Sequence, residues 1–357
     1  MSQSAGMSSE QITRWWWLIP PAVLYREWRL NRSWYLLAFA IMLGAWLLPW
    51  IGSVVHPRHF AQMAQQVVAD YPLLPPLALP EVNCIVMGIL AVVVFQNDWT
   101  RGQIGRVLEG PVRRSDILSA KLGFLLATLV AYALIVFIGL TVFAVIARST
   151  GRIGYVGSWD LLATSMGSAT GILALAAGTA MSNPILVGLT TAIWVVFPKI
   201  ISGIIATATP LVRLPGGVVV SPPNPWSIAV DRLSPFPNSE PANHLILYAL
   251  YFLVWAVFMG YRALKWWNTV PTERFGSTFF YPQLWNFYYA LLALVSAYVM
   301  ALILSQPLMP QLGTPFYVSY GTLSVLAWFF WRAMYRRRRR SPDRAATRPT
   351  RMDEGNT

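Results

Sequence analysis

The sequence has 357 residues, of which 56% are apolar and only 11% are charged, with a formal net charge of +13. Soluble domains are about 45–50% apolar and about 25% charged, so this chain cannot cover its surface with polar groups and is predicted to be a polytopic membrane protein. The same composition excludes a disordered chain, a collagen and a disulfide-rich secreted scaffold. The single cysteine, Cys84, excludes both an intramolecular disulfide and a thiolate metal cluster.

The N-terminal segment 1–21 is rich in tryptophan and is expected to be disordered. Its apolar run is too short for a cleavable signal peptide and ends at two prolines. Residues 22–32 then mix apolar and basic side chains at helical spacing, with Arg26 and Arg29 among the basic ones. This pattern predicts a helix lying in the membrane interface before the first span, and a simple extension of that span is the alternative.

Eight windows poor in charge follow, and they predict an all-α protein with about eight transmembrane helices. A membrane helix needs about 20 predominantly apolar residues, and the second window is shorter than the others. The fourth and fifth windows are divided at Ser182-Asn183-Pro184. The predicted spans are 33–57, 82–97, 122–147, 160–181, 185–206, 245–261, 285–305 and 316–334.

The distribution of Lys and Arg predicts the orientation. Most of these residues, including the run Arg336–Arg340, fall on the side that also holds both termini. The positive-inside rule therefore places both termini in the cytoplasm. We expect the membrane to be a bacterial plasma membrane. We divide the chain into a six-helix core (33–264), two additional helices (265–336) and a basic disordered tail (337–357).

Two loops are long. The loop 207–243 is predicted to be external, is rich in proline, and contains a segment (224–233) suited to a short helix. The loop 97–121 is predicted to be cytoplasmic, with an amphipathic helix, a sharp break at Gly110-Pro111, and a second helix capped by Ser115. From the residues alone, a solvated basic loop is an equal alternative.

The loop 97–121 resembles the segment between the second and third helices of ABC-2 type transporter permeases. Its order of Gly, Leu, Pro-Val, Arg, Ile-Leu and Lys follows the family pattern, whereas Gln103, Gly105 and Arg113 depart from it. The segments 25–37 and 271–276 also resemble family segments, so the resemblance covers roughly residues 22–336. The matching positions are Gly102, Leu108, Pro111, Val112, Arg114, Ile117, Leu118 and Lys121.

This resemblance implies the transmembrane half of an ATP-driven transporter, assembled with a second permease copy or a paralogue. In that family the loop is a coupling helix that docks on a separate ATPase subunit. The chain has no G-x-x-x-x-G-K-[ST] loop, so ATP and Mg are expected on the partner and no catalytic residue or enzyme activity is expected here. The implied contacts with the ATPase are Pro111, Val112, Arg113, Arg114, Ile117, Leu118 and Lys121.

Two further features have competing explanations. Lys199 lies in the fifth predicted span, where a cation either faces a substrate path or a lipid phosphate, or reaches out to the interface. The fourth span carries small residues four apart, Gly167 with Gly171 and Ala174 with Gly178, which favours close helix packing over a ligand groove. No set of metal ligands is complete, and no nucleic-acid site is expected.

Two other classes of function are compatible with the sequence. The chain could be a membrane enzyme that acts on lipid or cell-wall precursors, or a membrane anchor or assembly protein without transport. The sequence does not distinguish lipid, peptide, drug and polysaccharide as substrates.

Overall fold

The computed structural model of the chain describes residues 19–54, 79–100, 113–146, 153–207, 212–213, 219–220, 225–231, 245–270, 284–305, 320–330 and 332–333. Pro111 and Val112 lie outside the described residues, as do most of the segment 1–21 and the tail 337–357.

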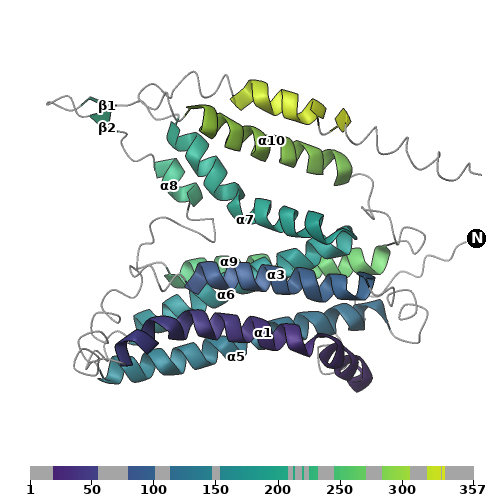
Figure 1. Cartoon of the computed structure of the whole chain (residues 1–357), viewed down its shortest axis with the longest axis vertical. Helices are drawn as coiled ribbons and strands as arrows, with labels where there is room; N and C mark the ends of the chain where they lie inside the picture. Colours follow the sequence, from purple (N-terminus) through teal and green to yellow (C-terminus); the bar gives the residue numbers. More distant parts are fainter. Residues whose placement is uncertain are drawn as a thin grey trace, which may run out of the picture. The chain divides into compact units, whose positions relative to one another are not determined.

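The described residues are almost entirely helical (Figure 1). Five of the helices are long and apolar enough to cross a membrane, which supports the predicted class of a polytopic helical protein. Their apolar windows run from Pro80 to Asn97, Arg114 to Val142, Val156 to Ala180, Pro184 to Gly203 and Leu245 to Thr269. The helices are α1 (Pro21–Val54), α3 (Leu79–Thr100), α5 (Arg114–Ile146), α6 (Ile153–Ala180), α7 (Pro184–Thr207), α8 (Pro225–Asp231), α9 (Leu245–Thr269) and α10 (Leu284–Ser305), followed by a shorter apolar helix at Tyr320–Phe330.

The predicted break between the fourth and fifth spans is confirmed. α6 ends at Ala180 and α7 begins at Pro184. Asn183 caps α7, because its side-chain oxygen accepts hydrogen bonds from the backbone N–H of Ile185 (2.9 Å) and Leu186 (3.4 Å). Proline is well suited to the first helical position, since the N–H that it lacks would have no partner there.

Three local features differ from, or refine, the sequence predictions. Residues 22–32 form the first turns of α1, a helix of 34 residues. α5 begins at Arg114 rather than after Ser115, so Asp116 lies in the first turn and Ser115 does not cap the helix. Within the loop 207–243, the predicted short helix is confirmed as α8. This loop also contains β1 (Val212–Arg213), paired antiparallel with β2 (Val219–Val220).

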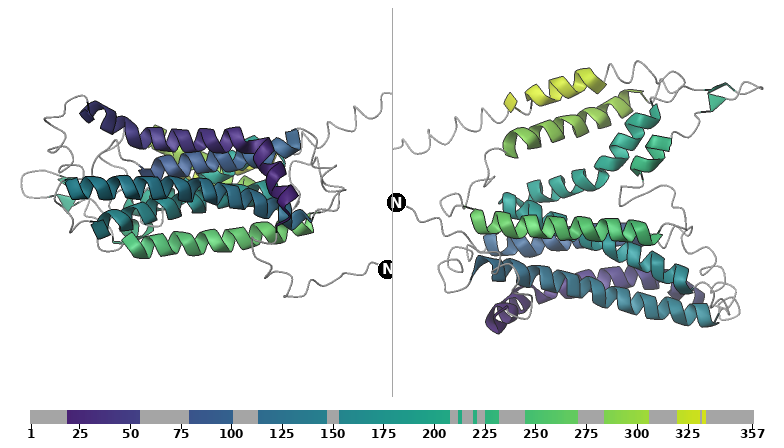
Figure 2. Two further views of the ribbon diagram at one scale, coloured as in Figure 1. Left: turned by 90° about the horizontal axis from the view of Figure 1, so that it is seen from below. Right: turned by 180° about the vertical axis from the view of Figure 1, so that it is seen from behind.

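The chain forms two compact units. The first, Met1–Lys199 with Val230–Phe280, contains a helix bundle of α1, α3, α5, α6 and α9, whose helices run side by side (Figure 2). α6 packs against α3, α5 and α9, while α1 packs against α3 and α5. Most of α6 is therefore buried, whereas α9 leaves large apolar side chains such as Val254 and Val257 exposed, as expected for a surface that faces lipid.

The second unit, Ile200–Ala229 with Tyr281–Thr357, contains the end of α7, most of α8, α10 and the helix 320–330. Ser202 and Ser227 join α7 to α8. The hydroxyl of Ser202 donates to the Ser227 carbonyl (2.9 Å), and the hydroxyl of Ser227 donates to the Ser202 carbonyl (3.1 Å). The boundary between the units falls inside α7, between Lys199 and Ile200. It lies close to Pro198, which removes one backbone donor from that helix.

Candidate functional site

A buried ion pair lies at the end of the helix bundle next to the loop 101–112. The Lys121 Nζ on α5 is 2.9 Å from the Glu27 Oε2 on α1, and the two side chains are only 3% and 1% exposed. The same ammonium group donates to the carbonyl of Val94 on α3 at 3.0 Å. One cation therefore joins three helices.

Three further polar side chains complete this site. Asn31 and Tyr35 both donate to the Glu27 Oε1, at 2.7 and 2.8 Å. Asn97, near the end of α3, donates to the Asn31 side-chain oxygen at 2.8 Å. Both carboxylate oxygens of Glu27 therefore have partners, as a buried charge requires. We call Glu27, Asn31, Tyr35, Asn97 and Lys121 the polar cluster.

Sequence reasoning missed the polar cluster, although a signal was present. Glu27, Asn31 and Tyr35 are spaced four residues apart and therefore share one face of a helix. The basic side chains of the same segment instead favoured the prediction of a helix at the membrane surface. Val23 of the same segment packs in a small buried cluster with Ala120 of α5.

A second set of contacts joins the beginning of α5 to the end of α9. The guanidinium of Arg114 donates to the carbonyl of Val270 at 2.7 Å, and the Trp267 indole N–H donates to the Arg114 carbonyl at 2.9 Å. A cation is favourable at this position, because the carbonyls at a helix C-terminus carry partial negative charge. Trp267 also meets the ring of Phe95 on α3 edge-on, with centroids 5.3 Å apart.

The residues that were predicted to contact the ATPase therefore lie in different environments. Arg113 is exposed at the beginning of α5, and Arg114 is half-buried through its contacts with α9. Ile117, Leu118 and Lys121 are instead buried in the helix bundle, at 3%, 1% and 2% exposure. These three side chains have almost no surface left for a partner and connect helices within the chain.

The small residues of α6 lie where other helices approach closely. A Cβ added at Gly171 would lie 3.0 Å from a methyl carbon of Leu125 and 3.4 Å from the backbone oxygen of Met87. One added at Gly178 would lie 2.7 Å from the ring of Phe95, and one at Gly167 would lie 3.1 Å from the Asn83 Cβ. Ala174 is fully buried. These small residues of α6 therefore lie against α3 and α5.

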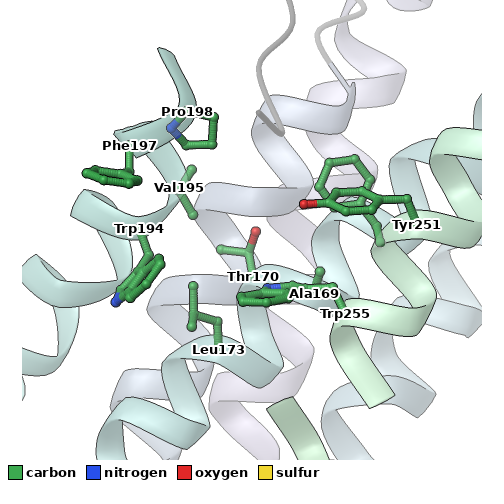
Figure 3. A pocket seen from close by; sticks show the side chains of 10 residues that line it. Ala169, Thr170, Leu173, Trp194, Val195, Phe197, Pro198, Tyr251 and Trp255 are labelled. Carbon is green, nitrogen blue, oxygen red and sulfur yellow. The ribbon is translucent and has the colours of Figure 1, made fainter. Parts of the chain in front are cut away.

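An aromatic pocket of about 120 Å³ lies between α6, α7 and α9 (Figure 3). Trp194 and Phe197 line it from α7, and Tyr251 and Trp255 line it from α9. Lys199 follows Pro198, the last α7 residue that lines this pocket, and its side chain is half-buried. Lys199 lies four residues before the end of the apolar window at Gly203.

Asp160 lies inside the apolar window of α6 and is only 7% exposed. The buried part of the bundle therefore contains an acid in addition to Glu27. Within the described ranges, no three His, Cys, Asp or Glu side chains gather into a group that could hold a metal ion.

Comparison of the chain with models of known protein families, with curated proteins and with solved structures finds no match.

Proposed function

We propose that the chain is the transmembrane subunit of an ABC-2 type transporter, with about eight spans and both termini in the cytoplasm. A separate ATPase subunit, which binds ATP and Mg, docks on the loop 97–121, and a second permease copy or a paralogue completes the pathway in the plasma membrane. The sequence pattern of the loop supports this function. The main structural support for the proposal is that α3 and α5, the helices on either side of this loop, are hydrogen-bonded to other helices.

Movement of the loop would be transmitted to most of the bundle. On the α3 side, the carbonyl of Val94 accepts a hydrogen bond from Lys121, and the side-chain amide of Asn97 donates to Asn31. On the α5 side, Arg114 is bonded to Val270 and Trp267 at the end of α9. A partner that holds the loop differently with and without ATP would therefore shift α1, α3, α5 and α9 together, because it stabilises one arrangement of these helices over another.

Burial guides which side chains we assign to the docking surface within this proposal. Pro111, Val112 and Arg113 are the contacts that we assign to the ATPase, together with the exposed part of Arg114. We assign transmission rather than contact to Ile117, Leu118 and Lys121, because they are buried.

A charge reversal beside the loop tests the proposal. The tagged chain is purified from its native membranes in mild detergent, and ATP hydrolysis by the purified assembly is measured. Arg113→Glu combined with Val112→Asp should remove most of this hydrolysis and leave membrane insertion unchanged. Lys265→Glu is the matched control, because Lys265 is an exposed cation near the same end of the bundle, on α9. The proposal fails if the native assembly contains no ATP hydrolase, or if the double variant retains normal activity.

A further inference from the structure

A second cavity, of about 360 Å³, lies along the side of the first unit. Its walls are α3, from Cys84 to Val93, and α7, from Gly188 to Val196, with Thr170 of α6 among the lining residues. We call it the lateral groove. Its volume is at the lower end of the about 300–1,000 Å³ that is usual for ligand pockets.

The lining of the lateral groove offers almost nothing to a polar ligand. Its two threonines are the main polar residues, and both hydroxyls are used inside their own helices. Thr170 donates to the Met166 carbonyl at 3.0 Å, and Thr191 donates to the Val187 carbonyl at 2.8 Å. The remaining lining is aliphatic apart from the buried thiol of Cys84. A sugar, a peptide backbone or a charged group would leave its own polar atoms unpaired there, at a cost of about 1–3 kcal/mol each.

The surroundings of the lateral groove identify what can reach it. Both walls lie inside apolar windows long enough to cross a membrane. The rim is open, since Ile85 and Ile89 on α3 are 55% and 60% exposed and Val196 on α7 is 41% exposed. Such side chains at bilayer depth face hydrocarbon rather than water. The neighbouring molecules are therefore lipid tails, and an empty apolar groove beside them would lose contacts that a tail supplies.

We propose that the lateral groove binds one acyl chain of a bilayer lipid, which enters sideways between α3 and α7. The lining is apolar and its two threonine hydroxyls are already hydrogen-bonded, so the groove favours a hydrocarbon chain. The lipid headgroup stays outside the groove. The inference depends on the membrane placement of α3 and α7 but not on the ATPase, so it can fail while the proposed function holds, and the reverse.

Photo-crosslinking tests the proposal. The purified chain is reconstituted into liposomes that contain a phospholipid with a diazirine in the middle of one acyl chain, and the labelled peptides are mapped after irradiation. Label is expected on the groove-lining parts of α3 and α7. The lipid-facing residues of α9, such as Val254 and Val257, give an internal measure of ordinary lipid contact.

Blocking the groove supplies the decisive comparison. Gly188 lines the groove, and a Cβ added there meets nothing within 4 Å, so Gly188→Leu should fill the space without a clash. Label on the groove peptides should fall about tenfold, as for a loss of about 1.4 kcal/mol in binding, while label on α9 stays unchanged. Gly44→Leu is the matched control, because a Cβ added to this α1 glycine also meets nothing within 4 Å.

Two outcomes would overturn the proposal. Groove peptides labelled no more than α9, or equally in the wild type and in Gly188→Leu, would show no bound chain. Disulfide crosslinking between two copies through Ile89→Cys, with Cys84 replaced by Ala, would show that a second copy covers the groove instead. If Gly188→Leu fails to insert, Ala192→Phe blocks the groove from an exposed lining position on α7 and gives the same comparison.

Discussion

The Glu27 carboxylate and the Lys121 ammonium lie 2.9 Å apart although 94 residues separate them in the chain. Their contact joins the first turns of α1 to α5, seven residues after α5 begins at Arg114. Because Lys121 also bonds to the Val94 carbonyl, α3 is held at the same point. The polar cluster therefore fixes the arrangement of three helices at the end of the bundle where the loop 101–112 is attached.

Breaking this ion pair from one side should destabilise the protein strongly. Lys121→Met leaves the buried Glu27 carboxylate without its cation, and removal of one partner from a buried pair costs about 3–5 kcal/mol. The free energy of unfolding in a denaturing detergent, followed by tryptophan fluorescence, measures this loss.

The double variant Glu27→Leu with Lys121→Met should be more stable than Lys121→Met alone, because no unpaired charge remains buried. Lys265→Met, at an exposed position, is the control and should change stability by less than about 0.5 kcal/mol. A double variant that loses the sum of the two single effects would contradict the assignment of a coupled pair.

The contact between α5 and α9 gives a weaker, local prediction. Trp267→Phe removes the indole N–H that bonds to the Arg114 carbonyl but keeps a ring beside Phe95. The loss should be about 0.5–1.5 kcal/mol, the usual net value of one hydrogen bond. Hydrogen exchange should become faster at the backbone amides of the first turns of α5. Trp266→Phe, on the next position of α9, should leave that exchange unchanged, since the indole of Trp266 lies under the guanidinium of Arg262.

Local chemistry explains which parts of the fold the sequence could predict. The break at Asn183-Pro184 depends on a cap and a proline that act within one turn of helix, so it can be recognised from neighbouring residues. The apolar windows of α5 and α9 likewise depend on composition alone. The pairing of Glu27 with Lys121 depends on which helices become neighbours, and no local pattern determines that.

The same limit applies to the candidate site. The family-like pattern of the loop led us to expect that Ile117 and Leu118 contact a partner, whereas burial places them inside the bundle. A pattern in one segment does not show which side of a helix the other helices cover. The four-residue spacing of Glu27, Asn31 and Tyr35 was the sequence feature that could have indicated the polar cluster. It predicts a buried site only when the helix that supplies the cation is known.

The close approach of α6 to α3 predicts a large effect from a single methyl group. Gly178→Ala would place a Cβ 2.7 Å from the ring of Phe95, which is buried and also packed on Trp267. Because that ring has little room to move, the variant should lose about 1–3 kcal/mol, as is typical of overpacking in a core. Unfolding in denaturing detergent again gives the measurement.

Gly154 on the same helix supplies the matched control, since a Cβ added there meets nothing within 4 Å. Gly154→Ala should change stability by no more than about 0.5 kcal/mol. Equal effects of the two substitutions would show that α6 does not approach α3 as closely as the structure has it.

The hydrogen bonds between Ser202 and Ser227 predict an engineered disulfide in the second unit. Their hydroxyl oxygens lie 3.1 Å apart, so two cysteines at these positions bring their sulfurs close to bonding distance. In a chain with Cys84→Ala, the variant Ser202→Cys with Ser227→Cys should lose both free thiols under mild oxidation, as counted by maleimide labelling of the denatured protein. Each single cysteine variant should keep its thiol under the same treatment. Two free thiols in the oxidised double variant would contradict the close contact between α7 and α8 at these two positions.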